Sequence, residues 1–401
     1  MRILLIDVNC KNSSTGRIVY DLFQDVRRRG HEALLCYGRG VLVKEEGIYK
    51  FGLDWETYIH AGLSRLTGYN GCFSRLSTRR LIHVVEQFKP DVVHIHELHA
   101  YFVNIKPLID YMKKKHIKVV WTFHCEYMYT GKCGHANSCA NFEKKCGNCP
   151  ELYAYPKSLF FDKTEHMLRI KKELLNNLDF RIICPSEWLR DRVRRSFLKE
   201  KRIDVIYNGV DTEIFRPTEG HIVKKQLQIP PTSKVVLSVG ADILSERKGG
   251  SEAQSLARRF GSDVFFVLAG ARTDRITRKR NVIILPTVSS TEHLAMLYTM
   301  ADVFLLCSKK ETFSMTCAEA LCCGTRVVGY RCGAPVTIFK RPYAVFVEQG
   351  DMDALEVETK RVLVEGWTLE DREKCAIDAQ CKYGKDQMAE KYFDIYRGTA
   401  G

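Results

Sequence analysis

The sequence predicts an α/β protein with two doubly wound domains, each built on a parallel β-sheet. Three observations support this prediction. Short apolar, β-branched runs alternate with helical patterns along the chain. The alternation stops at a polar segment, residues 211–220, and then starts again. The length of 401 residues exceeds what one ordinary hydrophobic core requires. Near-continuous apolar strands are typical of parallel sheets that are covered by helices on both faces.

The first series of apolar runs begins with RILLIDV at residues 2–8. A helical pattern follows at 16–31, and its apolar residues fall on one face: Ile18, Val19, Leu22, Phe23 and Val26. The same criteria predict further strands at 32–38, 91–97, 118–124, 180–186 and 203–209. This series predicts the first doubly wound domain.

The second series predicts strands at 234–242, 263–271, 282–286, 302–308, 326–330 and 344–347, with helices such as 292–301 between them. We therefore expect one domain at 1–212, with an insertion at 130–150, and a second at 213–380. An amphipathic helix is expected within the last segment, 381–401. Ligands of such domains bind at the carboxyl ends of the strands, in the cleft between domains.

Composition and charge narrow the function classes. A hydrophobic fraction of 45% and a charged fraction of 27% are typical of a soluble globular protein. No apolar run approaches the ~20 residues that span a bilayer, and Asp7 interrupts the apolar opening, so no signal peptide is expected. The net charge of +14 favours an anionic partner: a phosphorylated substrate, an acidic membrane surface or a nucleic acid. No P-loop is present, and no convincing G-x-G-x-x-G follows a strand, which argues against ATPases and dehydrogenases.

The stretch KKETFSMTCAEALCCGTRVVGY, residues 309–330, places Glu311 in a strand-to-helix turn and Glu319 inside the following helix. Ser314 is the predicted N-cap and Gly324 the predicted end of this helix. Free amides at a helix start attract phosphate, and flanking carboxylates accept hydrogen bonds from sugar hydroxyls. The pattern fits a nucleotide sugar, although a surface helix with a loop carboxylate would show the same spacing.

Further motifs follow in a specific order: DVVHIHE at 91–97, TFH at 122–124, PSEWL at 185–189, VIYNGVDTEIFRP at 205–217, RKGG at 247–250 and AEALCCGTRVV at 318–328. With these motifs the chain resembles family 4 retaining glycosyltransferases nearly end to end. The resemblance implies the GT-B fold, in which two Rossmann-like domains face a central cleft. It also implies that 1–212 binds the acceptor, that 213–380 binds the nucleotide sugar, and that 381–401 packs back on the N-terminal domain.

The resemblance implies a role for each matched residue. Glu311 would hold the transferred sugar, Glu319 the ribose, and Lys248 the departing diphosphate, with Arg247 beside it. His124 would face the transferred sugar. The remaining implied donor contacts are Gly16, Thr287, Phe313, Ser314, Met315 and Thr316. Residue chemistry alone also permits a helix-start lysine at Lys248, a satisfied strand-end histidine at His124 and a turn glycine at Gly16.

The resemblance implies a metal-independent reaction with retention of anomeric configuration, and DMD at 351–353 is expected to be a helix cap and not a metal site. The chain departs from the family pattern at several positions. Asp242 stands where the family has an arginine, Thr312 replaces a glycine and Arg326 a proline. These departures concern donor identity and catalytic strength more than the fold.

Four cysteines, Cys133, Cys139, Cys146 and Cys149, fall in the insertion 130–150, which is similar to one in bacterial exopolysaccharide transferases of the colanic acid type. The final C-x2-C pair suggests structural zinc, with His135 as a substitute ligand, whereas the first pair is spaced more widely than in zinc knuckles. Disulfides and free thiols are the alternatives. The 12 other cysteines are expected to be reduced thiols.

The predicted function is transfer of a hexose-type sugar from a UDP- or GDP-linked donor to a lipid-linked or oligosaccharide acceptor in surface polysaccharide synthesis. The predicted location is the cytoplasm, with the inner face of the membrane as a peripheral site. A nucleotide-sugar epimerase of similar fold is the alternative enzyme. A basic nucleic-acid-binding protein is a weaker one, because no recognition helix or aromatic-interleaved basic strand is evident.

Overall fold

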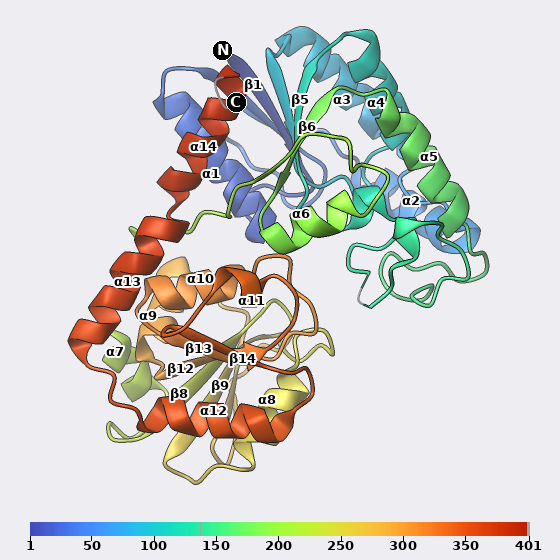
Figure 1. Ribbon diagram of the computed structural model, residues 1–401. Coiled ribbons are helices and arrows are strands. Elements are labelled where there is room, and N and C mark those ends of the chain that lie inside the picture. The colour runs from blue at the N-terminus through green and yellow to red at the C-terminus, as the bar shows by residue number, and fades with distance from the viewer. Residues whose placement is uncertain (137, 399–401) are drawn as a thin grey trace. The chain divides into compact units, whose positions relative to one another are not determined.

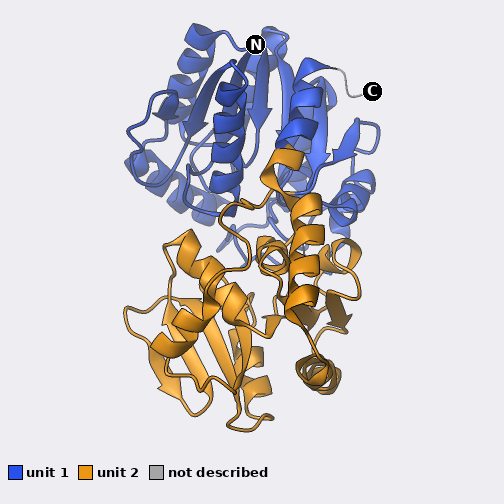
Figure 2. Ribbon diagram, turned by 90° about the vertical axis from the view of Figure 1, so that its left-hand side faces the viewer, with its two compact units in different colours: residues 1–207, 389–401 blue, residues 208–388 orange. Residues whose placement is uncertain are grey.

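The structure is a computed structural model that describes residues 1–136 and 138–398. The chain forms two compact units, residues 1–207 with 389–401 and residues 208–388 (Figure 2). The predicted boundaries were 212 and 380, and residues 399–401 of the predicted C-terminal segment lie outside the described residues. Each unit carries a seven-stranded sheet with helices packed against it (Figure 1).

The sheet of unit 1 is parallel throughout, in the order β3-β2-β1-β4-β5-β6-β7. Its strands are β1 (Arg2–Asp7), β2 (Glu32–Tyr37), β3 (Ile48–Lys50), β4 (Val92–Ile95), β5 (Lys118–Thr122), β6 (Phe180–Cys184) and β7 (Ile203–Val205). Strands β1, β4 and β5 are central and almost fully buried, as their apolar runs predict. This order brings the carboxyl ends of β1, β4 and β5 side by side.

The helices of unit 1 are α1 (Ser14–Arg28), α2 (Asp54–Thr67), α3 (Arg75–Phe88), α4 (Ile105–Lys114), α5 (Thr164–Asn176) and α6 (Glu187–Arg194), with short 3₁₀ turns η1 (Tyr127–Tyr129) and η2 (Asn141–Glu143). The last helix, α14 (Lys385–Arg397), begins in unit 2 and belongs to unit 1 from Ala389 on. Within unit 1, Tyr392 and Tyr396 of α14 bond to Thr122 and His94, respectively. The end of the helix thereby contacts β4 and β5.

The sheet of unit 2 has the order β10-β11-β9-β8-β12-β13-β14 and is parallel except for the β10–β11 pair. Its strands are β8 (Lys234–Val239), β9 (Val264–Ala271), β10 (Thr277–Lys279), β11 (Val282–Pro286), β12 (Val303–Leu306), β13 (Arg326–Tyr330) and β14 (Ala344–Val347). Strand β10 was not predicted, because its three residues are polar and exposed. Its pairing with β11 makes it a strand despite the missing hydrophobic pattern.

The helices of unit 2 are α7 (Gly220–Gln226), α8 (Gly250–Ala257), α9 (Thr291–Met300), α10 (Met315–Cys322), α11 (Pro335–Ile338), α12 (Met352–Val364) and α13 (Leu369–Tyr383). The predicted cap at Asp351 is confirmed, because its carboxylate accepts a hydrogen bond from Ala354 N at 2.9 Å. In the part of the chain that the structure describes, no helix combines the length and the hydropathy that crossing a bilayer would take.

Candidate active site

An ion pair joins the loops that follow two central strands of unit 2. Lys248 Nζ lies 2.7 Å from Glu311 Oε1, and each side chain is 13% exposed. Burial raises the pKa of Glu311, but the attraction of Lys248 and then of Arg247 outweighs burial, so this pKa lies below its ordinary value. Glu311 is therefore an ionised carboxylate with a nearly buried cation beside it. The sequence also permitted an exposed loop carboxylate at Glu311 and an exposed helix-start lysine at Lys248. The low exposure of both side chains rules these two alternatives out.

The backbone fixes both partners of this pair. Glu311 N donates to Cys332 O at 2.7 Å, and Ala334 N donates to Glu311 O at 3.0 Å, which anchors the loop after β12. Lys248 precedes Gly249, whose φ of +73° lies in the left-handed region. A Cβ at Gly249 would come within 2.2 Å of Cys307 O, so only glycine allows this turn to pack against the end of β12.

The start of α10 differs from the predicted cap. Ser314 does precede the helix, but its φ is 81° and its side chain makes no capping bond. Its hydroxyl instead lies 3.2 Å from Thr316 Oγ1 and 3.3 Å from Cys317 Sγ. The first-turn amides of α10 thus have no side-chain cap, and the first turn contains no acidic residue. Gly324, with φ +77°, ends this segment as predicted.

Glu319 is a core residue of α10, 1% exposed, and its Oε2 accepts a hydrogen bond from Tyr298 OH at 2.8 Å. Phe313 is also buried and packs edge-on against the rings of Phe339 and Tyr383. These contacts hold both side chains in the interior of unit 2. The surface-helix alternative for Glu319 is therefore wrong.

Other predicted donor residues of unit 2 are more exposed. Arg247 and Thr287 both lie on the surface, Thr287 directly after β11. Asp242, which stands in place of an arginine, adopts φ 61° and pairs with Arg272 at 3.0 Å. Of the two predicted cations, Lys248 forms the ion pair with Glu311. Arg247 acts on Glu311 only through its charge.

Gly16 lies in unit 1, in the first turn of α1, and its N–H donates to Ser13 Oγ at 3.1 Å. A Cβ at this position would meet Ser13 Oγ at 3.1 Å and Asn9 O at 3.2 Å. The close neighbours of Gly16 are thus atoms of the chain itself, which accounts for a glycine here without a ligand.

His124 follows β5 and is buried. Its Nε2 lies 2.9 Å from Nδ1 of His96, and burial lowers the pKa of His124 to about 4, which keeps the ring neutral at neutral pH. His94 on β4 and His96 directly after it are also buried. His94 bonds to Tyr396 OH at 2.6 Å and to Thr122 Oγ1 at 2.8 Å, whereas His96 contacts His124.

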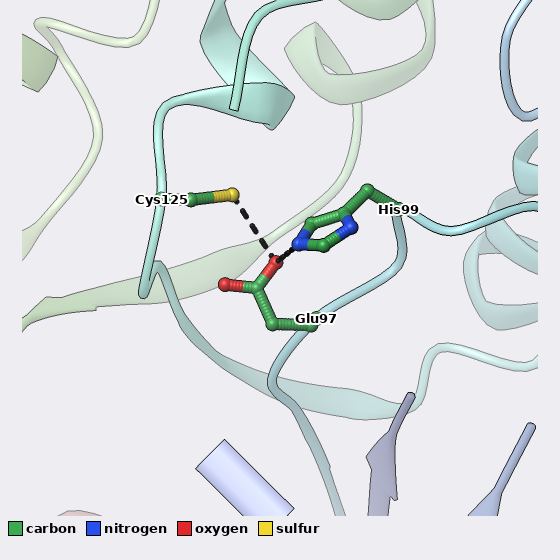
Figure 3. Close-up of side chains that lie close together, drawn as sticks. All are labelled: Glu97, His99 and Cys125. Carbon is green, nitrogen blue, oxygen red and sulfur yellow. Dashed lines mark hydrogen bonds and ion pairs between the residues drawn. The ribbon is translucent and has the colours of Figure 1, made fainter. Parts of the chain in front are cut away.

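A buried polar cluster that the sequence reasoning missed lies beside His124, at the ends of β1, β4 and β5. Glu97 Oε2 accepts from Cys125 Sγ at 3.2 Å and lies 2.9 Å from His99 Nε2 (Figure 3). Glu97 N donates to Asp7 Oδ1 at 3.2 Å. A signal was present, because Asp7 and Glu97 each end an apolar run. The sequence does not reveal that these two strands are neighbours.

The pKa values of the two carboxyls of this cluster are shifted in opposite directions. Burial, and then the charge of Glu97, raises the pKa of Asp7 to about 7. Burial also raises the pKa of Glu97, but His99 overcomes it and the pKa falls to about 2. At neutral pH the cluster thus combines an ionised Glu97 with an Asp7 that exchanges its proton. Such a pair can donate to and accept from a hydroxyl group.

Asp7→Asn tests this assignment through stability. The pKa of Asp7 is about 7 in the folded protein and its ordinary value is 3.8, so the folded state binds the proton more tightly. Stability from this group is present at low pH and is lost as pH rises through about 7. We expect the wild type to gain about 2–3 kcal/mol more than Asp7→Asn between pH 8 and pH 5. Urea unfolding at both pH values measures this, and equal gains would refute the raised pKa.

The cysteine insertion does not match the zinc expectation. Cys133, Cys139, Cys146 and Cys149 all line one cavity of about 10 Å³, and all four are free thiols. Among the described residues, the group with three potential ligand atoms within 4.8 Å of one another is Glu97, His99 and Cys125, not the quartet. In that triad Glu97 Oε2 already accepts from Cys125 Sγ and pairs with His99 Nε2. Zinc at the quartet therefore lacks support in the structure, and His135 joins no such group.

Two family models and a curated relative match this chain. Residues 15–214 match the family Glycosyltransferase Family 4, and residues 221–380 match Glycosyl transferases group 1. A putative colanic acid biosynthesis glycosyl transferase, WcaC of Escherichia coli (strain K12), is 23% identical over 99% of this chain and 100% of its own.

Solved structures share the fold. A sucrose-phosphate synthase of Thermosynechococcus elongatus superposes with a TM-score of 0.72 at 16% identity, over 100% of this chain and 99% of its own. Anabaena HepE, solved in complex with UDP and glucose, superposes with a TM-score of 0.67 at 15% identity, over 98% of this chain and 99% of its own.

Proposed function

The chain belongs to the family 4 type of glycosyltransferases and has the GT-B fold, and from this premise we propose which groups hold its substrates. We infer that it transfers a hexose from a UDP- or GDP-linked sugar to a lipid-linked or oligosaccharide acceptor. The observation that supports the donor assignment best is the Lys248–Glu311 ion pair beside the uncapped start of α10. No observation favours the epimerase or the nucleic-acid-binding alternative.

The donor diphosphate would lie against the first-turn amides of α10 and Lys248 Nζ. Negative charge builds on the departing phosphate as its bond to the anomeric carbon breaks. Amides and a cation fixed in advance stabilise that charge without reorganisation. Because Lys248 Nζ donates a hydrogen bond to Glu311 Oε1, this contact would orient both groups before the donor binds. A divalent ion is not required for this arrangement.

Glu311 would accept hydrogen bonds from hydroxyls of the transferred sugar, and its ionised state suits that role. Glu319 would receive the ribose only if its bond with Tyr298 is shared or exchanged, because the carboxylate is buried. We expect Thr287, exposed after β11, to approach the base. Arg247 would supply positive charge near the diphosphate in place of the arginine lost at position 242.

The acceptor hydroxyl would bind at the cluster of Asp7, Glu97, His99 and Cys125, since ligands of parallel sheets bind at the carboxyl ends of the strands. An ionised Glu97 can accept a hydrogen bond from the acceptor hydroxyl and so fix the direction of that O–H group. The family membership favours retention of anomeric configuration, with the leaving phosphate as the base. His124, neutral and hydrogen-bonded to His96, would be a hydrogen-bond partner of the sugar and not a cation.

A thermal-shift screen of UDP-, GDP- and other nucleotide sugars, with and without EDTA, tests the donor site. A ligand at a hundred times its Kd adds about 2.7 kcal/mol to the free energy of unfolding, so we expect a rise of several degrees in Tm. The rise should occur with one nucleotide sugar and persist in EDTA. Loss of the shift in EDTA would contradict metal independence, and no shift across a complete panel would contradict the donor site.

A further inference from the structure

Helix α2 of unit 1 has its polar side inside and its apolar side outside. The inward residues are polar: Glu56, Thr57, His60 and Ser64 are all buried. The outward residues are large and apolar: Trp55 is 54% exposed, Tyr58 73%, Ile59 53%, Leu63 37% and Leu66 50%. Their spacing of three and four residues places them on one helical face. A surface helix normally shows the reverse pattern.

Specific hydrogen bonds lock this orientation. The Glu56 carboxylate accepts from Leu76 N and Ser77 N, both at 2.8 Å, and so supplies the cap that the start of α3 otherwise lacks. His60 Nδ1 lies 2.8 Å from Ser74 Oγ in the same turn. Rotating α2 to bury its apolar face would break these bonds. The exposed apolar face is therefore a fixed feature of unit 1.

A neighbouring loop extends the apolar face. Leu159, Phe160 and Phe161 are 42%, 68% and 55% exposed. Leu159 N donates to Arg65 O near the end of α2, at 2.8 Å. The carbonyl of Phe161 lies so close to Gly68 that a Cβ there would be 2.5 Å away. The outward residues of α2 and residues 159–161 thus form one surface, which we call the apolar face.

Cations lie beside the apolar face: Arg65 is on α2 itself, Lys157 precedes Leu159 by two residues, and Arg75 and Arg79 are on α3, whose first amides bond to Glu56 of α2. Arg65, Arg75, Arg79 and Lys157 are exposed, and none of them has an ion pair within the described chain. Arg75 and Arg79 line a surface pocket of about 490 Å³. The neighbouring carboxylates are engaged: Asp54 pairs with Lys50 at 2.8 Å, and Asp162 accepts from Thr164 N at 2.9 Å and from Cys149 N at 2.7 Å. The surface therefore carries unpaired cations as well as exposed apolar side chains.

We propose that the apolar face docks the protein on a bilayer of anionic phospholipids. Aromatic and aliphatic side chains on one helical face, with cations beside them, are what an interfacial helix presents to lipid. A second copy of this chain is a poorer occupant, because a symmetric contact would set the same unpaired cations of both copies against one another. The proposal extends the proposed function, because docking on a bilayer would bring the protein to a lipid-linked acceptor. Its functional meaning therefore rests on that proposed function. Its evidence is independent of the donor site.

Sedimentation with vesicles tests the proposal on the full chain. We expect the wild type to bind vesicles rich in phosphatidylglycerol and to bind pure phosphatidylcholine at least tenfold more weakly. The triple variant Ile59→Gln, Leu66→Gln, Phe160→Gln should lose at least tenfold in binding to the anionic vesicles. The control Val364→Gln, Leu369→Gln, Ile377→Gln changes three apolar residues of unit 2 that are 86%, 80% and 59% exposed, and it should bind like the wild type.

A second readout does not depend on the triple variant. Trp55 is the most exposed tryptophan, so its fluorescence should shift to the blue and be quenched by brominated lipid. Trp55→Phe should keep the binding and lose that shift. Undiminished vesicle binding by the triple variant, or an unchanged Trp55 signal on binding, would overturn the proposal. So would a wild-type dimer that becomes monomeric in the triple variant and binds no vesicles.

The donor site has its own readout. The thermal shift with nucleotide sugar, measured without lipid, should be the same in the wild type and in both triple variants. If that shift is kept while vesicle binding fails, the docking surface is wrong and the donor site stands. If vesicle binding occurs but no nucleotide sugar shifts the Tm, the docking surface stands and the donor assignment is wrong.

Discussion

Lys248→Met should lower kcat about a thousandfold, the largest effect we expect from a single substitution. Lys248 is a nearly buried cation at the proposed diphosphate site, and it contacts Glu311 at 2.7 Å. Removing one group that stabilises charge in the transition state typically costs a factor of 10²–10³, and the lysine carries a full charge. Steady-state rates of nucleoside diphosphate release, measured at saturating donor, report the change.

This substitution also leaves the carboxylate of Glu311 without its ion-pair partner, which by itself costs roughly 3–5 kcal/mol of stability for a buried pair. The double variant Lys248→Met, Glu311→Gln removes that unpaired charge, so it should regain stability but not activity. Lys234→Met is the matched control, because Lys234 forms an ion pair with Asp302 at the opposite end of β8. An active double variant would contradict the catalytic role of the lysine.

Glu311→Gln should lower turnover about a hundredfold and should cost less stability than Lys248→Met. Glutamine has the same shape, and its amide oxygen can still accept the hydrogen bond from Lys248 Nζ. It cannot offer two charged oxygens to sugar hydroxyls, and hydrogen bonds to charged groups are about twice as strong as neutral ones. Turnover with the best donor, together with Tm, measures the two effects separately.

Glu356→Gln is the control for this change. Glu356 on α12 also pairs with cations, Arg259 and Lys360, yet it lies on a different helix from the proposed site. Its turnover should equal that of the wild type. Turnover of Glu311→Gln within twofold of the wild type would contradict the proposed contact between this carboxylate and the sugar.

The sequence was most informative where one periodicity dominated. The apolar runs of β1, β8 and β12 predict buried parallel strands because both faces of each sheet are covered. Strand β10 could not be predicted from the apolar pattern, because its pairing with β11, and not burial, makes it a strand. The contact between Lys248 and Glu311 could not be predicted from the sequence either. The partners are 63 residues apart, and only the sheet order brings β8 and β12 together.

The prediction that the Ser314 side chain caps α10 was wrong. A serine before a helix predicts a side-chain cap, but the hydroxyl bonds to Cys317 and Thr316 while the backbone takes a left-handed conformation. The outward orientation of the apolar face of α2 could not be predicted for a related reason. Its apolar spacing alone would predict a buried face, whereas the hydrogen bonds of Glu56 and His60 turn that face outward. In both places specific hydrogen bonds override a general preference.

Binding of a free nucleoside diphosphate and of the intact nucleotide sugar, measured by calorimetry, tests the central claim most directly. The account predicts that Lys248→Met weakens both ligands at least tenfold. It predicts that Glu311→Gln weakens the nucleotide sugar at least tenfold and leaves the nucleoside diphosphate within twofold of the wild type. Equal weakening of both ligands by Glu311→Gln, or unchanged nucleoside diphosphate binding in Lys248→Met, would show that the ion pair does not hold the donor as proposed.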